Sequence, residues 1–146
     1  MALIVQKFGG TSVGSIERIR NVAWRVAKWQ SAGHRIVVVP SAMSGETNRL
    51  LTLAAGLQEH PDPRELDVVA STGEQVTVGL LAMALLALGV KARSYAGWQV
   101  KVLTDSANGA GRYPGSPAWV MSRVPARASP VKVIRPRRPQ IQRPAP

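Results

Sequence analysis

Apolar and polar positions change their period along the first hundred residues. The apolar run over residues 3–8 predicts a buried strand, and a run over 35–39 predicts another, which ends at Pro40 because proline cannot donate to a sheet ladder. Between the two runs, apolar residues recur at helical spacing from Ser15, which can cap a helix, to Gly33, which can end one. The order strand, helix, strand indicates an α/β protein with a mainly parallel sheet.

The same alternation continues to about residue 103. Glycine, proline and small polar residues separate the later elements, and Gly89 ends the last helix. The predicted elements are a helix from the loop at 41–47 through about Gly56, a turn at 60–63, helices at 64–71 and 75–88 on either side of a break at 72–74, and short strands at 91–95 and 99–103.

The longest uncharged stretch covers residues 76–90 and is shorter than the roughly 20 apolar residues that a membrane-spanning helix needs. We therefore predict a buried helix there and no membrane association. The N-terminus combines its short apolar run with neither a basic region nor a small-residue cleavage site, so no signal peptide is expected. The chain has no cysteine, which excludes disulfides and thiolate metal sites and fits a cytoplasmic protein.

Charge and proline content divide the chain near Ala107. Residues 1–106 hold 11 Lys and Arg against all 8 Asp and Glu, whereas residues 107–146 hold the other 8 basic residues, no acidic residue and 8 of the 11 prolines. A basic, proline-rich stretch without a sustained period of 2 or 3.6 predicts disorder. We therefore expect one domain over residues 1–107 and a tail over residues 108–146.

Candidate chemistry begins where the first predicted strand ends, in the stretch KFGGTS at residues 7–12. A strand that meets a glycine-rich loop and then a helix N-terminus brings backbone N–H groups together, and the helix dipole adds positive potential. Lys7 adds a full charge, and the hydroxyls of Thr11 and Ser12 add donors, so phosphate is the natural guest. The spacing matches neither Walker A nor GxGxxG, and a strand-end lysine that only reaches solvent is an equal alternative from these residues alone.

Further segments extend this pattern. KFGGTSVGS at 7–15, VVVPSAMSGETNRLL at 37–51 and LDVVASTGEQVTVGLLAMAL at 66–85, continued by YAGWQVKVLTDSA at 95–107, resemble the N-terminal half of the catalytic domain of the aspartokinases, in the amino-acid kinase family. The resemblance covers residues 2–107 in order. It implies a three-layer αβα sandwich with a mainly parallel sheet, incomplete in this chain. It also implies a cytoplasmic, homo-oligomeric enzyme that uses ATP and Mg²⁺ to phosphorylate the β-carboxylate of L-aspartate.

Five positions correspond to the nucleotide site of this family: Lys7, Phe8, Gly9, Gly10 and Ser41. The resemblance implies that Lys7 is catalytic, because a lysine there balances the charge that develops between the β and γ phosphates. It also implies that Ser41 lies close to the phosphates, although a serine in that loop can equally serve as a helix or turn cap.

Two positions correspond to the aspartate site of the family. The resemblance implies that Thr47 hydrogen-bonds the bound aspartate and that Glu74 holds its α-amino group through charge-assisted hydrogen bonds. Without the resemblance, Thr47 would be an ordinary exposed hydroxyl and Glu74 a solvated residue at a helix N-terminus. Phosphoryl transfer requires mainly positioning and charge neutralisation, so His34 and His60 are given no catalytic role, and no metal ligand is assigned.

The tail departs from the family, which should continue with further strands and helices from Asn108 onward. We favour a frameshift or truncated gene model as the origin of the tail. The alternative is a functional basic arm, in which RPRRPQIQRP contacts the phosphates of nucleic acid, although Tyr113 and Trp119 precede the arginines and stacking on single strands has little support.

Three hypotheses for the function follow. The first is an aspartokinase fragment that is inactive on its own. The second is a non-catalytic binding module with a nucleic-acid-binding tail. The third is a chain that does not fold stably, because strand edges such as residues 36–39 stay exposed and promote aggregation.

Overall fold

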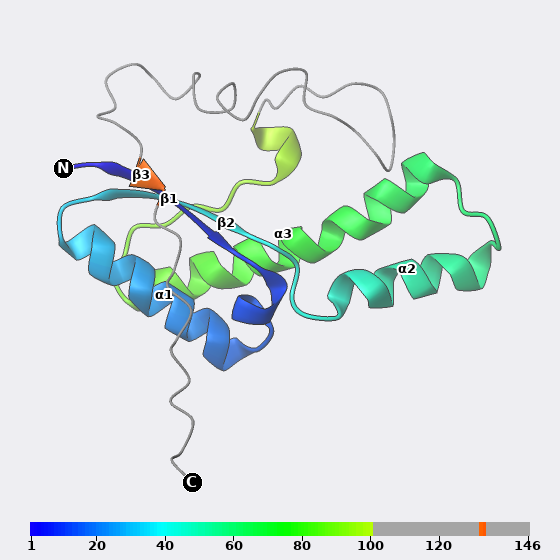
Figure 1. The fold of residues 1–146 in the computed structure, drawn as a ribbon, viewed down its shortest axis with the longest axis horizontal. Coiled ribbons are helices and arrows are strands. Elements are labelled where there is room, and N and C mark those ends of the chain that lie inside the picture. The colour runs from blue at the N-terminus through cyan, green and yellow to red at the C-terminus, as the bar shows by residue number, and fades with distance from the viewer. Residues whose placement is uncertain (101–131, 134–146) are drawn as a thin grey trace, which may run out of the picture.

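The computed structural model describes residues 1–100 and 132–133 (Figure 1). Three strands, three α-helices and two short 3₁₀ helices are assigned within these residues. In chain order they are β1 (Leu3–Phe8), η1 (Gly10–Val13), α1 (Ile16–Ser31), β2 (Arg35–Pro40), α2 (Glu46–Leu57), α3 (Pro63–Ala87), η2 (Gly97–Gln99) and β3 (Lys132–Val133). The strands predicted at 3–8 and 35–39 and the helix between them are confirmed.

The sheet is parallel and has the order β2-β1-β3. The register of β1 and β2 runs from Leu3 opposite Arg35 to Phe8 opposite Pro40, so the two strands end side by side. Their connection through α1 is the βαβ unit that joins parallel strands. The prediction of an α/β protein with a parallel sheet is therefore confirmed.

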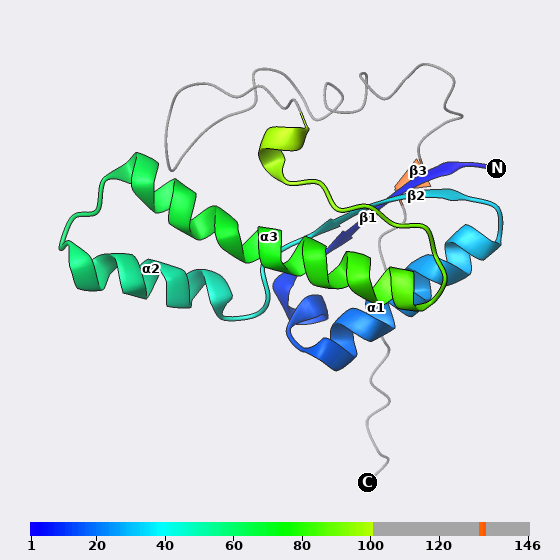
Figure 2. The same ribbon diagram turned by 180° about the vertical axis from the view of Figure 1, so that it is seen from behind.

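Helices α1 and α3 lie side by side along the strands, and α2 with the first half of α3 projects beyond them (Figures 1 and 2). Helices α1 and α3 cover the face of the sheet that carries Ile36 and Val38, and both of these residues pack against the core. Val37 and Val39 point to the opposite face and are 44% and 47% exposed.

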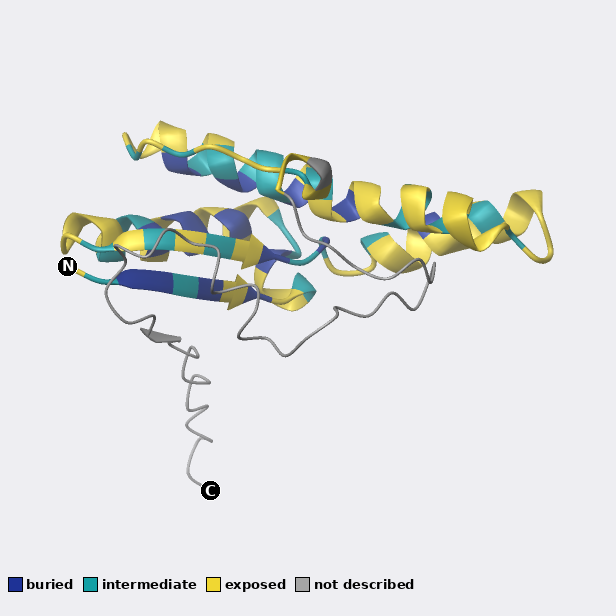
Figure 3. Ribbon diagram, turned by 90° about the horizontal axis from the view of Figure 1, so that it is seen from above, coloured by how far each residue is buried: buried dark blue, intermediate teal, exposed yellow. Residues whose placement is uncertain are grey.

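The core lies where α1, α3 and the end of β1 meet, and Figure 3 shows the buried residues of these elements in dark blue. Its α1 residues share one face at helical spacing, as the sequence pattern predicts. The buried members are Phe8, Val13, Ile19, Val22, Ala23, Val26, Leu81 and Leu85.

Two glycines end helices in the left-handed conformation. Gly33 has φ +82° and Gly89 has φ +75°. After each glycine the next N–H bonds back into the last turn, from His34 to the carbonyl of Trp29 and from Val90 to that of Leu85. These contacts form a Schellman motif at the C-terminal end of α1 and another at that of α3. The helix stops predicted at Gly33 and Gly89 are therefore confirmed.

The predicted break at 72–74 is wrong, because α3 runs without interruption from Pro63 to Ala87. The hydroxyls of Ser71 and Thr72 donate to carbonyls one turn earlier, so they do not compete with the helix. Gly73 lies on the buried side of α3 against the loop after β2. Tertiary packing there offsets the roughly 1 kcal/mol that a glycine costs inside a helix.

A buried helix is predicted over residues 76–90, but only one narrow face of α3 is buried. A stripe of one residue per turn is buried, namely Gly73, Thr77, Leu81 and Leu85, while Val76 and Met83 are exposed. By length and composition alone this helix could cross a membrane, a test that core helices of soluble proteins also pass. Its contacts with α1, α2 and β2 are those of a helix in a folded domain.

The C-terminal predictions have mixed outcomes. Residues 91–95 form no strand, because none of the described strands pairs with them, and Gly97–Gln99 is a 3₁₀ helix. Val100, the next residue of the strand predicted at 99–103, lies in no strand, and residues 101–103 lie outside the described residues. Of the predicted tail, the structure describes Lys132–Val133, which pairs with Ile4 and Val5 of β1.

Candidate phosphate and amino-acid site

The candidate site lies at the sheet edge where β1 and β2 end together. Because Phe8 and Pro40 are opposite each other, the loops that follow the two strands leave the sheet side by side. The N–H of Ser41 donates to the carbonyl of Phe8 at 2.9 Å and joins these loops directly. In open α/β sheets, ligands bind outside the carboxyl ends of the parallel strands, and the site occupies that position.

The loop after β1 combines an exposed cation with open backbone. Lys7 is exposed at the end of β1, and no described carboxylate lies within ion-pair distance of it. At Gly9, an added Cβ would meet nothing within 4 Å. The chain then turns into η1, where the N–H of Ser12 donates to the Gly9 carbonyl at 2.8 Å. The backbone around Gly9 is therefore accessible to a ligand.

The start of α1 is fixed to this loop. The Ser15 hydroxyl accepts from the N–H of Arg18 at 3.3 Å, which confirms Ser15 as the helix cap. The Arg18 guanidinium donates to the Thr11 carbonyl in η1. Hydrogen bonding from Ser15 and from the backbone lowers the pKa of the Glu17 carboxyl below its ordinary value, with a smaller effect from Arg20. The negative charge of Glu17 thus stabilises the helix N-terminus.

Ala42, the residue after Ser41, contacts both sides of the site. A Cβ added at Gly10 would stand 2.9 Å from the Ala42 carbonyl oxygen, and one added at Gly73 would stand 2.9 Å from the Ala42 Cβ. The N–H of Ala42 donates to Oε1 of Glu74 at 3.4 Å. The structure thereby brings Glu74 to the loop that carries Ser41.

Thr47 lies in the first turn of α2 and is exposed. Its neighbour Glu46 places Cγ 3.5 Å from the Cβ position of Gly73, so the start of α2 faces the middle of α3. The Arg49 guanidinium bonds both carboxylate oxygens of Glu46, at 2.7 and 3.0 Å. This contact lowers the pKa of Glu46 and raises that of Arg49. Thr47 and Glu74 are therefore carried by two helices packed together.

Residues 2–118 match the family model described as the amino acid kinase family. The chain belongs to the amino acid kinase family. The resemblance found in the sequence is confirmed for this family. The matched relatives are named as kinases, so the comparisons do not favour a nucleic-acid-binding module.

Individual relatives of this chain are named as aspartate kinases or aspartokinases. The chain is 67% identical over 108 residues to the aspartate kinase Ask_LysC of Stutzerimonas stutzeri, which covers 74% of this chain and 26% of that protein. It is 50% identical over 112 residues to aspartokinase 2 of Bacillus subtilis. That match covers 77% of this chain and 28% of the Bacillus protein.

Among solved structures, the aspartate kinase from Synechocystis matches with a TM-score of 0.59 and 50% identity, over 60% of this chain and 15% of that one. This likeness confirms the α/β fold expected for the family. The chain spans about a quarter of the length of the curated relatives it matches.

The site also depends on two residues that no sequence motif singles out. Ala42 and Gly73 contribute through a backbone hydrogen bond and close packing. The only signal for them is that small residues occupy both positions. Neither residue type carries functional chemistry, so pattern analysis had no reason to select either one.

Metal ligands are sparse in the described part of this chain. Within residues 1–100 and 132–133, no group of three His, Cys, Asp or Glu side chains could hold a metal ion. Mg²⁺ in kinases takes several ligands from substrate phosphates and water, and few from the protein. We therefore assign the metal to no residue.

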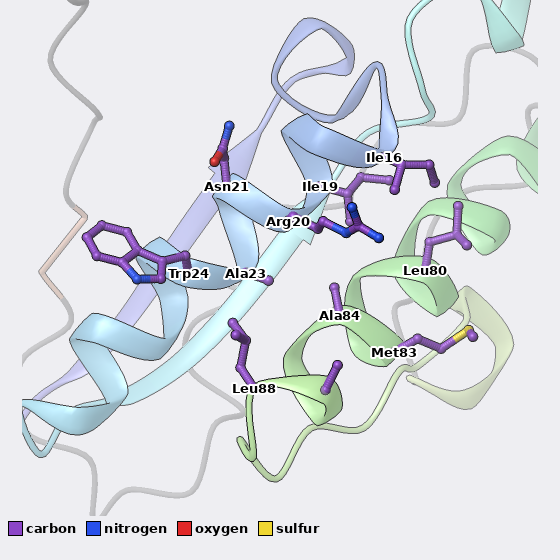
Figure 4. Close-up of a pocket in the computed structure, with 11 residues that line it drawn as sticks. Ile16, Ile19, Arg20, Asn21, Ala23, Trp24, Leu80, Met83, Ala84 and Leu88 are labelled. Atoms are coloured by element: carbon purple, nitrogen blue, oxygen red, sulfur yellow. The ribbon is translucent and has the colours of Figure 1, made fainter.

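An apolar groove of about 580 Å³ lies between α1 and α3, away from the sheet edge (Figure 4). Trp24 and Leu88 flank it, with Met83 and Ala84 of α3 along its side, and Trp24 is 61% exposed. None of the seven predicted site residues lines this groove. It is therefore separate from the candidate site.

Proposed function

We propose that this chain is the N-terminal part of an aspartokinase catalytic domain. The reaction would transfer the γ-phosphoryl group of ATP to the β-carboxylate of L-aspartate and give 4-phospho-L-aspartate, the first step of lysine, threonine and methionine biosynthesis. The observation that carries the proposal is the junction of the loops after β1 and β2, with Glu74 hydrogen-bonded into the second loop.

The nucleotide phosphates are assigned to Lys7, Phe8, Gly9, Gly10 and Ser41. The open space at Gly9 supports this assignment, because phosphate oxygens must approach backbone N–H groups closely. Lys7 supports it as well, since its charge is not neutralised by a described carboxylate. Among these residues Lys7 is the proposed catalytic group.

The amino acid is assigned to Thr47 and Glu74. The carboxylate of Glu74 accepts from only one described N–H and is exposed, so it retains acceptor capacity for an ammonium group. The position of both residues near the loop after β2 would set the β-carboxylate of aspartate next to the phosphates. Phosphoryl transfer gains most of its rate from such positioning and from charge neutralisation.

The described residues fit the triphosphate, whose negative charge Lys7 and the backbone of the first loop can neutralise. When bound, Mg²⁺ would neutralise further charge on the β and γ phosphates. Lys7 would hold the oxygen between the β and γ phosphates as charge develops there. No side chain needs to act as a nucleophile, because the substrate carboxylate attacks phosphorus.

The first test measures the melting temperature of the full 146-residue chain with and without Mg·ATP. A ligand that binds only the folded state raises stability by about 2.7 kcal/mol at a hundred times its dissociation constant. We expect an increase in the natural chain and none in Lys7→Met. Lys91→Met is the matched control, because Lys91 is also exposed but follows α3.

Two results would contradict the proposal. One is no response of the natural chain to Mg·ATP, or to L-aspartate added with it. The other is an equal response in Lys7→Met and in the natural chain. Loss of the response in both lysine variants would instead indicate a general effect of positive charge.

We further propose that residues 1–107 form this domain fragment, that residues 108–146 come from another reading frame, and that the chain is inactive alone. The family match ends at residue 118, so most of this tail lies outside it, which supports a different origin for the tail. Sequencing the DNA downstream of Asp105 tests it. A second frame that encodes further kinase motifs is expected. The intact enzyme would then be a cytoplasmic homo-oligomer.

A further inference from the structure

Ala42 is held on three sides by groups from different elements. Its methyl group packs against Gly73 in α3, its carbonyl lies on Gly10 in η1, and its N–H donates to Glu74. The side chain is buried, with 4% of its surface exposed. Ala42 therefore has little freedom to move independently of these neighbours.

The two glycine contacts are closer than any larger residue would allow. A Cβ at either Gly10 or Gly73 would come within 2.9 Å of Ala42, nearer than Cβ atoms approach in folded proteins. Gly14 adds a third contact to the same loop, since its Cβ position is 3.0 Å from the Cβ of Ser44. Tightly packed groups transmit displacement because no void absorbs it.

The chemistry at the two ends of this contact is different. Gly10 belongs to the loop assigned to phosphate, and Glu74 is the carboxylate assigned to the amino group. The N–H and the carbonyl of Ala42 belong to the two peptide planes that meet at its Cα. Because the Ala42 Cβ is packed against Gly73, we expect a shift of the segment at the carbonyl to move the N–H as well. Either the hydrogen bond from the Ala42 N–H to Glu74 then changes its length, or the Glu74 carboxylate moves with the N–H.

We propose that Ala42 is a positioning residue that couples the phosphate loop at Gly10 to the carboxylate of Glu74. This inference rests on the proposed function for its biological meaning. Filling the phosphate loop would shift Glu74 through Ala42, and an amino group on Glu74 would shift the phosphate loop in return. Such coupling is reciprocal, so each ligand changes the affinity of the other by the same factor.

The coupling is tested without ligand by recording amide resonances of the full ¹⁵N-labelled chain. Glu74→Ala removes the acceptor and, as an exposed position on α3, leaves the fold intact. We expect the amide resonances of Ala42 and Gly10 both to move. Glu74→Gln retains a carbonyl acceptor and is expected to restore most of both shifts. Glu65→Ala, at another exposed glutamate of α3, should move neither.

The converse experiment starts from the phosphate loop. Gly10→Ala is expected to displace Ala42 and to move the Ala42 amide resonance, whereas Gly9→Ala should not, because its Cβ meets nothing within 4 Å. If Gly10→Ala does not fold, the Glu74 series decides the question alone.

The outcomes separate the two proposals. A shift at Ala42 with no change at Gly10 in Glu74→Ala would overturn the coupling, and so would no shift at either amide. If both amides move but Mg·ATP leaves the spectrum of the natural chain unchanged, the coupling stands and the proposed function fails.

Discussion

Gln6 on β1 stands opposite Val38 on β2, and both face the helices that cover the sheet. The side chain of Gln6 is only 7% exposed, and its Oε1 finds no hydrogen-bond partner in the described part of the chain. A buried acceptor without a partner costs about 1–3 kcal/mol. The centre of the sheet therefore contains a polar group that weakens the fold.

Replacing this glutamine by methionine should stabilise the protein. Gln6→Met keeps a similar length and removes the unpaired oxygen, so we expect the free energy of unfolding to rise by about 1 kcal/mol. Urea denaturation measures the change. Gln30→Met at an exposed site of α1 is the control and should have little effect. A loss of stability in Gln6→Met would mean that Oε1 is satisfied in solution.

Replacing Gly79 and Gly89 by alanine should change the stability of the protein in opposite directions. Gly79 lies inside α3, where an added Cβ meets nothing within 4 Å, so Gly79→Ala should stabilise by about 0.5–1 kcal/mol. Gly89 has φ +75°, so Gly89→Ala should destabilise by about 1–2 kcal/mol. Thermal denaturation of both variants side by side measures these effects. Equal changes of the same sign would show that helix propensity alone governs the two sites.

The N-terminal cap of α3 should contribute measurably to stability. Asp62 Oδ1 accepts from the N–H groups of Arg64 and Glu65 at 2.9 and 3.2 Å. Asp62→Ala is expected to cost about 1 kcal/mol, and Asp62→Asn to retain most of the stability. Glu59→Ala removes an equal charge outside the helix and serves as the control. A similar loss in all three variants would assign the effect to charge and not to capping.

Stability should depend on pH through Glu46. The hydrogen bond from Arg49 lowers the folded pKa of Glu46 below its ordinary value of 4.5. The unfolded chain therefore binds the proton more readily, so this contribution is present above pH 4.5 and lost as pH falls through the folded pKa. Glu46→Gln should reduce stability slightly at pH 7 and have no effect at the lowest pH.

High salt provides the control for this ion pair. Because the pair is at the surface, added salt should decrease the difference between Glu46→Gln and the natural chain at pH 7. A difference that persists unchanged below the folded pKa would exclude the ion pair as its cause. Urea denaturation at both pH values gives the comparison.

Periodicity predicted the helices and strands that depend on local pattern and burial. Strand 3–8, strand 35–39 and the helix stop at Gly33 follow from the residues themselves. The errors occur where distant packing decides the outcome. Gly73 was predicted to break a helix because glycine is a poor helix former, but α3 continues since Ala42 packs against that glycine.

Pairing across the chain explains the other error. Residues 91–95 follow the helix stop at Gly89, where the alternation of an α/β protein predicts a strand, but a strand also requires a partner, and no sequence pattern supplies one. For the candidate site, the strand and glycine-rich loop point to Lys7, and the family resemblance adds Glu74. The hydrogen bond from the Ala42 N–H to Glu74 could not be predicted, because a backbone N–H has no sequence signature.

Each residue of β1 pairs with the residue of β2 that lies 32 positions later, from Leu3 with Arg35 to Phe8 with Pro40. Forming the first pair between β1 and β2 closes the loop between them and therefore aligns all the other pairs. The loss of chain entropy on loop closure occurs only once. Because the N-terminal part of a chain leaves the ribosome first, β1, α1 and β2 emerge before the part of α3 that carries Glu74. The loop after β1 can therefore be fixed between strand and helix before that part of α3 is available to pack against it.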